Sequence, residues 1–269
     1  MTTRPGSANE SWPDRFCWMD LKTHDTAGTA AFLSDVLGWR FAVDEEDWRK
    51  AVKISAGGRR IGGVSDLASP VYPPGIPAHI AYYLATDDVD RRTQTATANG
   101  ARVLVPPFDV GDQGRIATLA DPTGAAFSLW RRPGRSLGWH LPSRTPAGPR
   151  RMVLACEHPG RARDFYRRVT GAPLPYADFV TVSGTGTGTA SGTAAPQWEL
   201  AVGVDDLEDI AARVRAHGRG SVTRLDGTGV GGTAAGITTD TTTRPRPTAL
   251  RLSSPEGLTL RVELLEGGR

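Results

Sequence analysis

The chain repeats itself, and this internal repeat limits the folds that it can adopt. Three segments of the first half recur in the second: 32–38 (FLSDVLG) as 165–171 (FYRRVTG), 87–90 (DDVD) as 205–208 (DDLE), and 121–124 (DPTG) as 254–257 (SPEG). The first and third pairs have the same offset and the second pair a shorter one, so the second copy loses a segment and later regains an equal length. We predict that both changes fall in the low-complexity loops 183–196 and 227–243, where a change in length costs little. Such self-similarity predicts two halves with one fold.

The repeat and the composition together divide the 269 residues into two domains. The polar segment 1–13 is expected to be a loose tail, and 133–149, rich in proline and glycine, is expected to be a linker. The first domain is then predicted over 14–132 and the second over 150–267. Length alone agrees, since about 150 residues is typical of a domain.

Composition excludes several classes of function. The net charge is only +3, and the arginines occur as scattered pairs rather than as a stripe with aromatic residues, so no nucleic-acid partner is expected. The sequence has no run of about 18 apolar residues, so no membrane-spanning helix is expected. The start of the chain also lacks the apolar core of a secretory signal. Two cysteines cannot build a disulfide framework. A cytoplasmic protein with a small-molecule partner is the expectation.

The periodicity predicts an α+β fold. Alternating apolar residues indicate strands such as 16–21 and 79–85, and an apolar stripe at helical spacing indicates a helix over 26–37 that Gly38 ends. The acidic run 44–47 is expected to be a solvated hairpin tip. Each half then has the order β-α-β-β-β twice, although the third and fourth strands of the second half are indistinct.

This order resembles a known superfamily, and four segments carry the resemblance: 32–39 (FLSDVLGW), 86–90 (TDDVD), 99–107 (NGARVLVPP) and 110–130 (VGDQGRIATLADPTGAAFSLW). They are similar to the vicinal oxygen chelate superfamily, which includes glyoxalase I, bleomycin-resistance proteins and extradiol dioxygenases, and within it to tandem two-domain actinobacterial members. The resemblance implies that paired βαβββ modules curl into a cup-like mixed sheet with helices outside, and that the second domain is a degenerate copy.

Members of that superfamily hold a divalent metal through histidine, glutamine and glutamate on the first and last strands of the modules. In the first half, the resemblance places Trp18 and Ser128 at two of these positions, and only His79 could serve as a ligand. In the second half it places Arg261 at the closing position, where a cation opposes a metal. We therefore predict no metal ligands and no cofactor, while a divalent metal through His79 is left open.

Two carboxylates of the second half leave one more metal site open. Glu199 and Glu263, which lies two residues after Arg261, could hold a metal with an outside ligand. The alternative is that these carboxylates pair with arginine such as Arg261.

A cup without a metal is expected to hold a flat, apolar ligand. Trp18, Trp130 and Trp198 could form a stacking wall; alternatively, these large aromatics fill a cup that has lost its metal. The predicted ligand-binding residues are Trp18, Tyr83, Ser128, Trp130, Trp198, Glu199 and Arg261.

Two residues are candidates for acid–base catalysis. Asp20 shares a face of its strand with Trp18 and, if buried, could act as a general base. His79 would be its partner. The alternatives are that Asp20 pairs with an arginine and that His79 is a strand-edge histidine bonded to a neighbour.

Two functions from different classes follow. The first is a binding protein of the glyoxalase/bleomycin-resistance type, which holds an aromatic natural product in resistance or secondary metabolism. The alternative is an enzyme of natural-product biosynthesis (a lyase, isomerase or cyclase, hydroxylase or dioxygenase) that uses the same cup. A third interpretation gives the second half a structural role only. Because tandem halves replace the dimer of single-domain relatives, the chain is expected to be a monomer or a homodimer.

Overall fold

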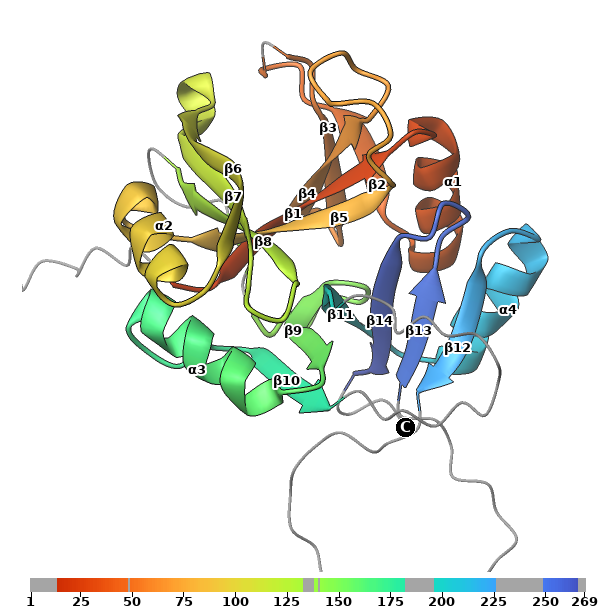
Figure 1. The fold of residues 1–269 in the computed structure, drawn as a ribbon. Coiled ribbons are helices and arrows are strands. Elements are labelled where there is room, and N and C mark those ends of the chain that lie inside the picture. The colour runs from red at the N-terminus through yellow and green to blue at the C-terminus, as the bar shows by residue number, and fades with distance from the viewer. Residues whose placement is uncertain are drawn as a thin grey trace, which may run out of the picture.

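Two β-sheets, one from each half of the chain, form the framework of the protein (Figure 1). The computed structural model describes residues 14–47, 49–132, 138–139, 141–181, 196–225 and 249–265. The predicted tail, part of the predicted linker and nearly all of the two low-complexity loops lie outside the described residues. No helix in the described ranges is long and apolar enough to cross a membrane.

The first half folds into one eight-stranded sheet with the order β2-β3-β4-β1-β5-β8-β7-β6. Within it, β1 (Phe16–Thr23) runs parallel to β4 (Arg59–Asp66) and antiparallel to β5 (His79–Ala85), and β5 runs parallel to β8 (Ala126–Arg131). Two four-stranded modules therefore meet along β1 and β5. The outer strands are β2 (Arg40–Val43), β3 (Val52–Ala56), β6 (Arg102–Asp109) and β7 (Arg115–Ala120), with the short 3-10 helix η1 (Gly111–Gln113) before β7.

Local signals in the sequence set the ends of the helices. Helix α1 (Thr26–Leu37) ends at Gly38, whose φ of 69° is one that glycine adopts without strain. Helix α2 (Val89–Ala98) begins after Asp88, whose carboxylate accepts a hydrogen bond from the backbone N–H of Arg91. The buried face of each helix packs on its module, so both helices lie outside the sheet, as predicted (Figure 1).

The second half forms a six-stranded sheet with the order β10-β9-β11-β14-β13-β12. Its elements are β9 (Pro149–Cys156), α3 (Pro159–Thr170), β10 (Ala177–Thr181), β11 (Trp198–Val204), α4 (Leu207–His217), β12 (Ser221–Leu225), β13 (Ala249–Ser253) and β14 (Thr259–Leu264). The parallel pairs β9–β10 and β11–β14 repeat the pairs β1–β4 and β5–β8 of the first half. The two halves thus share the predicted cup-like fold.

One predicted detail of the second half is wrong. Only the short segment 171–176 joins α3 to β10, whereas the much longer segment 38–58, which contains β2 and β3, joins α1 to β4. Because β10 pairs with β9 as β4 pairs with β1, the segment missing from the second half is the counterpart of the β2–β3 hairpin, and it is not lost from the loop 183–196. A hairpin at the edge of a sheet can be absent without disrupting the other strands, because only one of its two strands pairs with the rest of the sheet.

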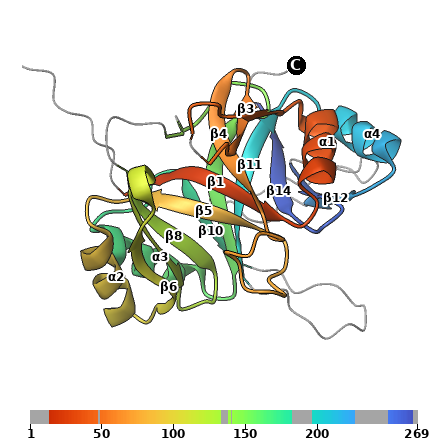
Figure 2. The same ribbon diagram turned by 90° about the horizontal axis from the view of Figure 1, so that it is seen from above.

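The halves pack against each other through their helices. Helix α1 lies beside α4, and α2 lies beside α3, as both views show (Figures 1 and 2). Between them, the ring of Trp198 contacts Phe16, with 4.8 Å between centroids, and Tyr166. The hydroxyl of Tyr82 accepts a hydrogen bond of 3.1 Å from the backbone N–H of Leu200. One buried apolar cluster therefore extends through both halves.

A carboxylate of the second half also holds the start of α1. Glu256, in the turn before β14, accepts hydrogen bonds from the hydroxyl of Thr23 and from the backbone N–H groups of His24 and Asp25. Burial is the largest single effect and raises the pKa of Glu256, but the hydrogen bonds together hold that pKa below its usual value. The repeated 121–124/254–257 turn thus makes a contact between the halves.

Candidate functional site

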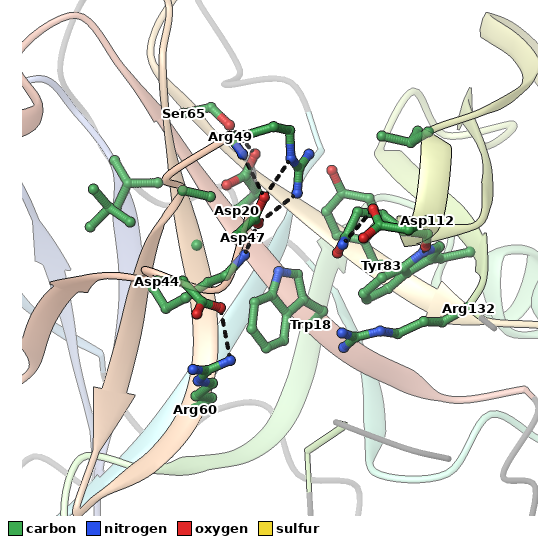
Figure 3. Close-up of a pocket in the computed structure, with 18 of the residues that line it drawn as sticks. Trp18, Asp20, Asp44, Asp47, Arg49, Arg60, Ser65, Tyr83, Asp112 and Arg132 are labelled. Carbon is green, nitrogen blue, oxygen red and sulfur yellow. Dashed lines mark hydrogen bonds and ion pairs between the residues drawn. The ribbon is translucent and has the colours of Figure 1, made fainter. Parts of the chain in front are cut away.

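A cleft of about 380 Å³ opens in the first half where its two modules meet (Figure 3). Strands β1, β3 and β4 and the loop after β2 form one wall, and β5, η1 and β8 contribute to the other. The cleft is therefore the interior of the cup that the sequence predicted for this half.

Three aromatic side chains gather in the cleft. Trp18 on β1 lies opposite Tyr83 on β5, and the ring of Trp130 on β8 lies 6.3 Å from Trp18 and 5.6 Å from Tyr83 between centroids. All three are half-buried. The indole N–H of Trp130 donates a 2.7 Å hydrogen bond to the carbonyl of Gln113, which fixes its ring. Burial raises the pKa of Tyr83, so its hydroxyl is neutral.

Asp20 presents its carboxylate to the same cleft. One oxygen accepts hydrogen bonds from the hydroxyl of Ser65, at 2.6 Å, and from the ammonium of Lys22, at 2.9 Å. Lys22 also donates to the hydroxyl of Tyr72. Burial is the largest single effect and lowers the pKa of Lys22, but its neighbours, with the charge of Asp20 first among them, together bring that pKa above its usual value. Asp20 is thus paired with a lysine, where the sequence alternative had an arginine.

Charged side chains of the β2–β3 hairpin complete the wall, and sequence reasoning missed them. The carboxylate of Asp47 is only 4% exposed; Arg49 and Lys53 each lie 3.0 Å from it. The expected solvated tip at 44–47 is therefore wrong for Asp47. A signal was present: Lys53 alternates with buried Ile54 on β3, which places a cation on the inner face of the strand.

The pairing of Asp47 makes stability dependent on pH. Hydrogen bonds from Arg49 hold the pKa of Asp47 well below its usual value. A depressed native pKa contributes stability above the unfolded pKa of about 4, and this stability is lost as the pH falls through the native value. We expect Asp47→Asn to lower the urea midpoint at pH 7 and the difference from wild type to shrink below pH 4.

The control for that measurement is Glu45→Gln, because Glu45 is an exposed carboxylate of the same hairpin, paired with Lys50. It should leave the midpoint nearly unchanged at every pH. A deficit of Asp47→Asn that is the same at pH 3 and pH 7 would contradict the role of the Asp47 charge.

His79 and Ser128 share the first sheet but have partners of their own. His79 is the first residue of β5 and pairs with Lys22 on β1, two positions along from Asp20. Its Nδ1 lies 2.8 Å from the carbonyl oxygen of Pro77, and His79 is not among the residues that line the cleft. Ser128 is buried, with its hydroxyl 2.8 Å from that of Thr118. The structure thus gathers Trp18, Asp20, Tyr83 and Trp130 in the cleft.

The other predicted residues lie in the second half, away from that cleft. Trp198 is 3% exposed and packs between the halves, so it does not join Trp18 and Trp130. Glu199 is 2% exposed and bridges two guanidiniums: Nε of Arg261 at 3.1 Å, as expected, and Nε of Arg251 at 2.7 Å.

The residues of the first cup do not fit a divalent metal. In the part of the chain that the structure describes, no three His, Cys, Asp or Glu side chains lie close enough to hold one. β4 contributes Gly63 and Ser65 to the cleft in place of a carboxylate. The buried carboxylate of Asp47 already has two cationic partners and Asp20 has one, so a dication would face fixed positive charge.

Comparison with known proteins agrees with this geometry. The model of the Glyoxalase/Bleomycin resistance protein/Dioxygenase superfamily matches residues 15–129. The first half of the chain is therefore similar to this superfamily over nearly its whole length. The Mn(II)-bound glyoxalase from Novosphingobium aromaticivorans, 15% identical, superposes with a TM-score of 0.52 over 93% of this chain and 81% of its own. The tandem glyoxalase fold therefore extends over both halves.

Two curated relatives align over most of the chain. The anthracycline biosynthesis protein DnrV of Streptomyces peucetius is 28% identical over 235 residues. The putative glyoxylase CFP32 of Mycobacterium tuberculosis is 29% identical over 217 residues. Each alignment covers 75% of this chain and 81% of the relative, so the similarity includes both glyoxalase-like halves.

Proposed function

We propose that the first cup binds a planar aromatic small molecule of natural-product metabolism. The observation that carries the proposal is the convergence of Trp18, Tyr83 and Trp130, all half-buried, on one cleft. Indole and phenol rings stack on flat aromatic ligands. Asp20 and Ser65 lie on the strands beside these rings and are among the polar groups that would orient such a ligand.

Size and similarity support the same ligand class. A volume of about 380 Å³ lies within the range of roughly 300–1,000 Å³ that small-molecule pockets occupy. DnrV, a relative over 75% of the chain, is described as an anthracycline biosynthesis protein. Binding without turnover, as in resistance by sequestration, needs nothing beyond the cleft itself.

The test is calorimetric titration of the protein with hydroxylated anthraquinones. Trp18→Ala should weaken binding about tenfold or more, because a lost stacking contact with its buried area contributes on the order of 1.4 kcal/mol or more. Trp18→Phe should recover part of the affinity. Phe108→Ala, which removes an exposed aromatic outside the cleft, is the matched control and should bind as wild type does. If Trp18→Ala and Phe108→Ala bind equally well, the cleft is not the binding site.

Catalysis in the same cleft is the second candidate, and the position of Asp20 favours it. Its carboxylate faces the space beside Tyr83 and could move a proton in a lyase, isomerase or cyclase reaction, with His79 on the diagonal position of the next strand as a partner. Mass spectrometry of a bound aromatic after incubation separates the two functions. An unchanged ligand supports binding alone. A changed ligand supports catalysis by Asp20 if Asp20→Asn abolishes turnover while binding persists; His79→Ala tests the partner in the same way.

A further inference from the structure

The buried carboxylates that line the cleft are paired with cations. Each lining carboxylate that is at least half-buried has a cation of its own: Asp20 pairs with Lys22, and Asp44 with Arg60. Asp47 has two such partners, as described above. The buried charges of the cleft wall are therefore paired with one another.

Arg132 adds a further cation to the cleft. Its guanidinium lies 5.5 Å from the centre of the Trp130 ring, and the residue is half-buried. Among the residues that the structure describes, no acidic side chain forms an ion pair with it. The remaining lining acids, Glu46 and Asp112, are exposed. Figure 3 shows the Arg132 side chain directed towards the cleft on the side of Trp18.

A guanidinium in this position can serve a ligand in two ways. It keeps its charge at every physiological pH, and its planar set of N–H donors matches the two oxygens of a carboxylate. Because Arg132 already stacks on Trp130, little side-chain freedom is lost when it binds an anion. A ring lying against Trp18 and Trp130 would bring its edge substituents to this guanidinium.

We propose that the ligand of the first cup is a planar aromatic carboxylate and that Arg132 binds its carboxylate group. This inference rests on the proposed function and narrows it to one class of ligand. The positive charge that faces the ligand in this cup is then the guanidinium of Arg132. The glyoxalase from Novosphingobium aromaticivorans, which has the same fold, is bound to Mn(II). The interaction is direct ion pairing with the ligand.

The test compares two probes of the same shape: anthraquinone-2-carboxylate and its neutral carboxamide. Calorimetry at pH 7 should show the wild-type protein binding the carboxylate at least tenfold more tightly than the carboxamide. Arg132→Gln should abolish this preference and leave the affinity for the carboxamide unchanged. Arg131→Gln is the matched control, because Arg131 is the exposed neighbour on β8 that does not line the cleft; it should retain the preference.

The outcomes separate this inference from the proposed function. If both probes bind the wild-type protein equally, or if Arg132→Gln retains the preference, the role of Arg132 is overturned while aromatic binding stands. If neither probe binds, aromatic binding in the cup is contradicted, and the inference with it. Unchanged affinity for the carboxamide in Arg132→Gln shows that the variant is folded.

Discussion

Replacing Trp198 with alanine is expected to lower the free energy of unfolding by about 3–5 kcal/mol, the usual cost of removing a buried tryptophan. The side chain is 3% exposed, and its ring lies 4.8 Å from Phe16 in the other half, 5.1 Å from Tyr166 and 5.4 Å from Phe179 between centroids. Its indole N–H also donates a 2.7 Å hydrogen bond to the Tyr166 hydroxyl. Urea unfolding followed by circular dichroism measures the loss.

Two variants show whether the loss arises from packing. Trp198→Phe retains most of the ring volume and should cost clearly less than Trp198→Ala. Trp18→Ala removes an indole that is only half-buried in the cleft, so it should also cost less. A loss below about 1 kcal/mol for Trp198→Ala would mean that the two halves do not depend on this contact.

Replacing Asp121 with alanine is expected to cost about 3 kcal/mol or more, because each hydrogen bond to a charged group contributes roughly 1.5–3 kcal/mol. The carboxylate is buried in the turn between β7 and β8. It accepts bonds from the backbone N–H groups of Thr123, at 2.8 Å, and Ala125, at 3.0 Å, and from the Thr123 hydroxyl. Its other oxygen accepts a 3.0 Å bond from the hydroxyl of Tyr166 in the second half.

A double-mutant cycle separates the turn from the contact between the halves. Tyr166→Phe removes only the hydroxyl that joins Trp198 to Asp121 and should cost about 1–3 kcal/mol. Because both single changes remove the same Tyr166–Asp121 bond, the double variant should lose less than the sum of the two. Strictly additive losses, measured by urea unfolding, would show that the bond contributes nothing.

Local features of the fold could be predicted from the sequence. Gly38 ends α1 and Asp88 begins α2 because these signals act on neighbouring backbone groups. The aromatic wall could also be predicted. Trp18 and Tyr83 are paired on adjacent strands, and the resemblance places Trp130 on the next strand of the same sheet.

The ion pairs of the site could not be predicted, because they depend on which strands meet. Lys53 reaches Asp47 only through the geometry of a hairpin, and Arg132 reaches the ring of Trp130 from just beyond the end of β8. The alternation of residues along a strand shows which face of the sheet a side chain lies on, but not which side chain it contacts. The same limit applies to Trp198, whose position faces the other half of the chain, and to Arg251, which joins Glu199 across strands.

The two halves pack through α1 against α4 and through α2 against α3, much as two subunits of a dimer would, but within one chain. In a homodimer, one gene encodes both partners, so every substitution is imposed on both cups at once. Here the partners are covalently joined and separately encoded, and each cup is free to acquire its own chemistry. The first cup contains the β2–β3 hairpin and an aromatic wall, whereas the second has no such hairpin between α3 and β10 and links a buried glutamate to two arginines. A single chain can therefore present two cups of one fold with different side chains in each.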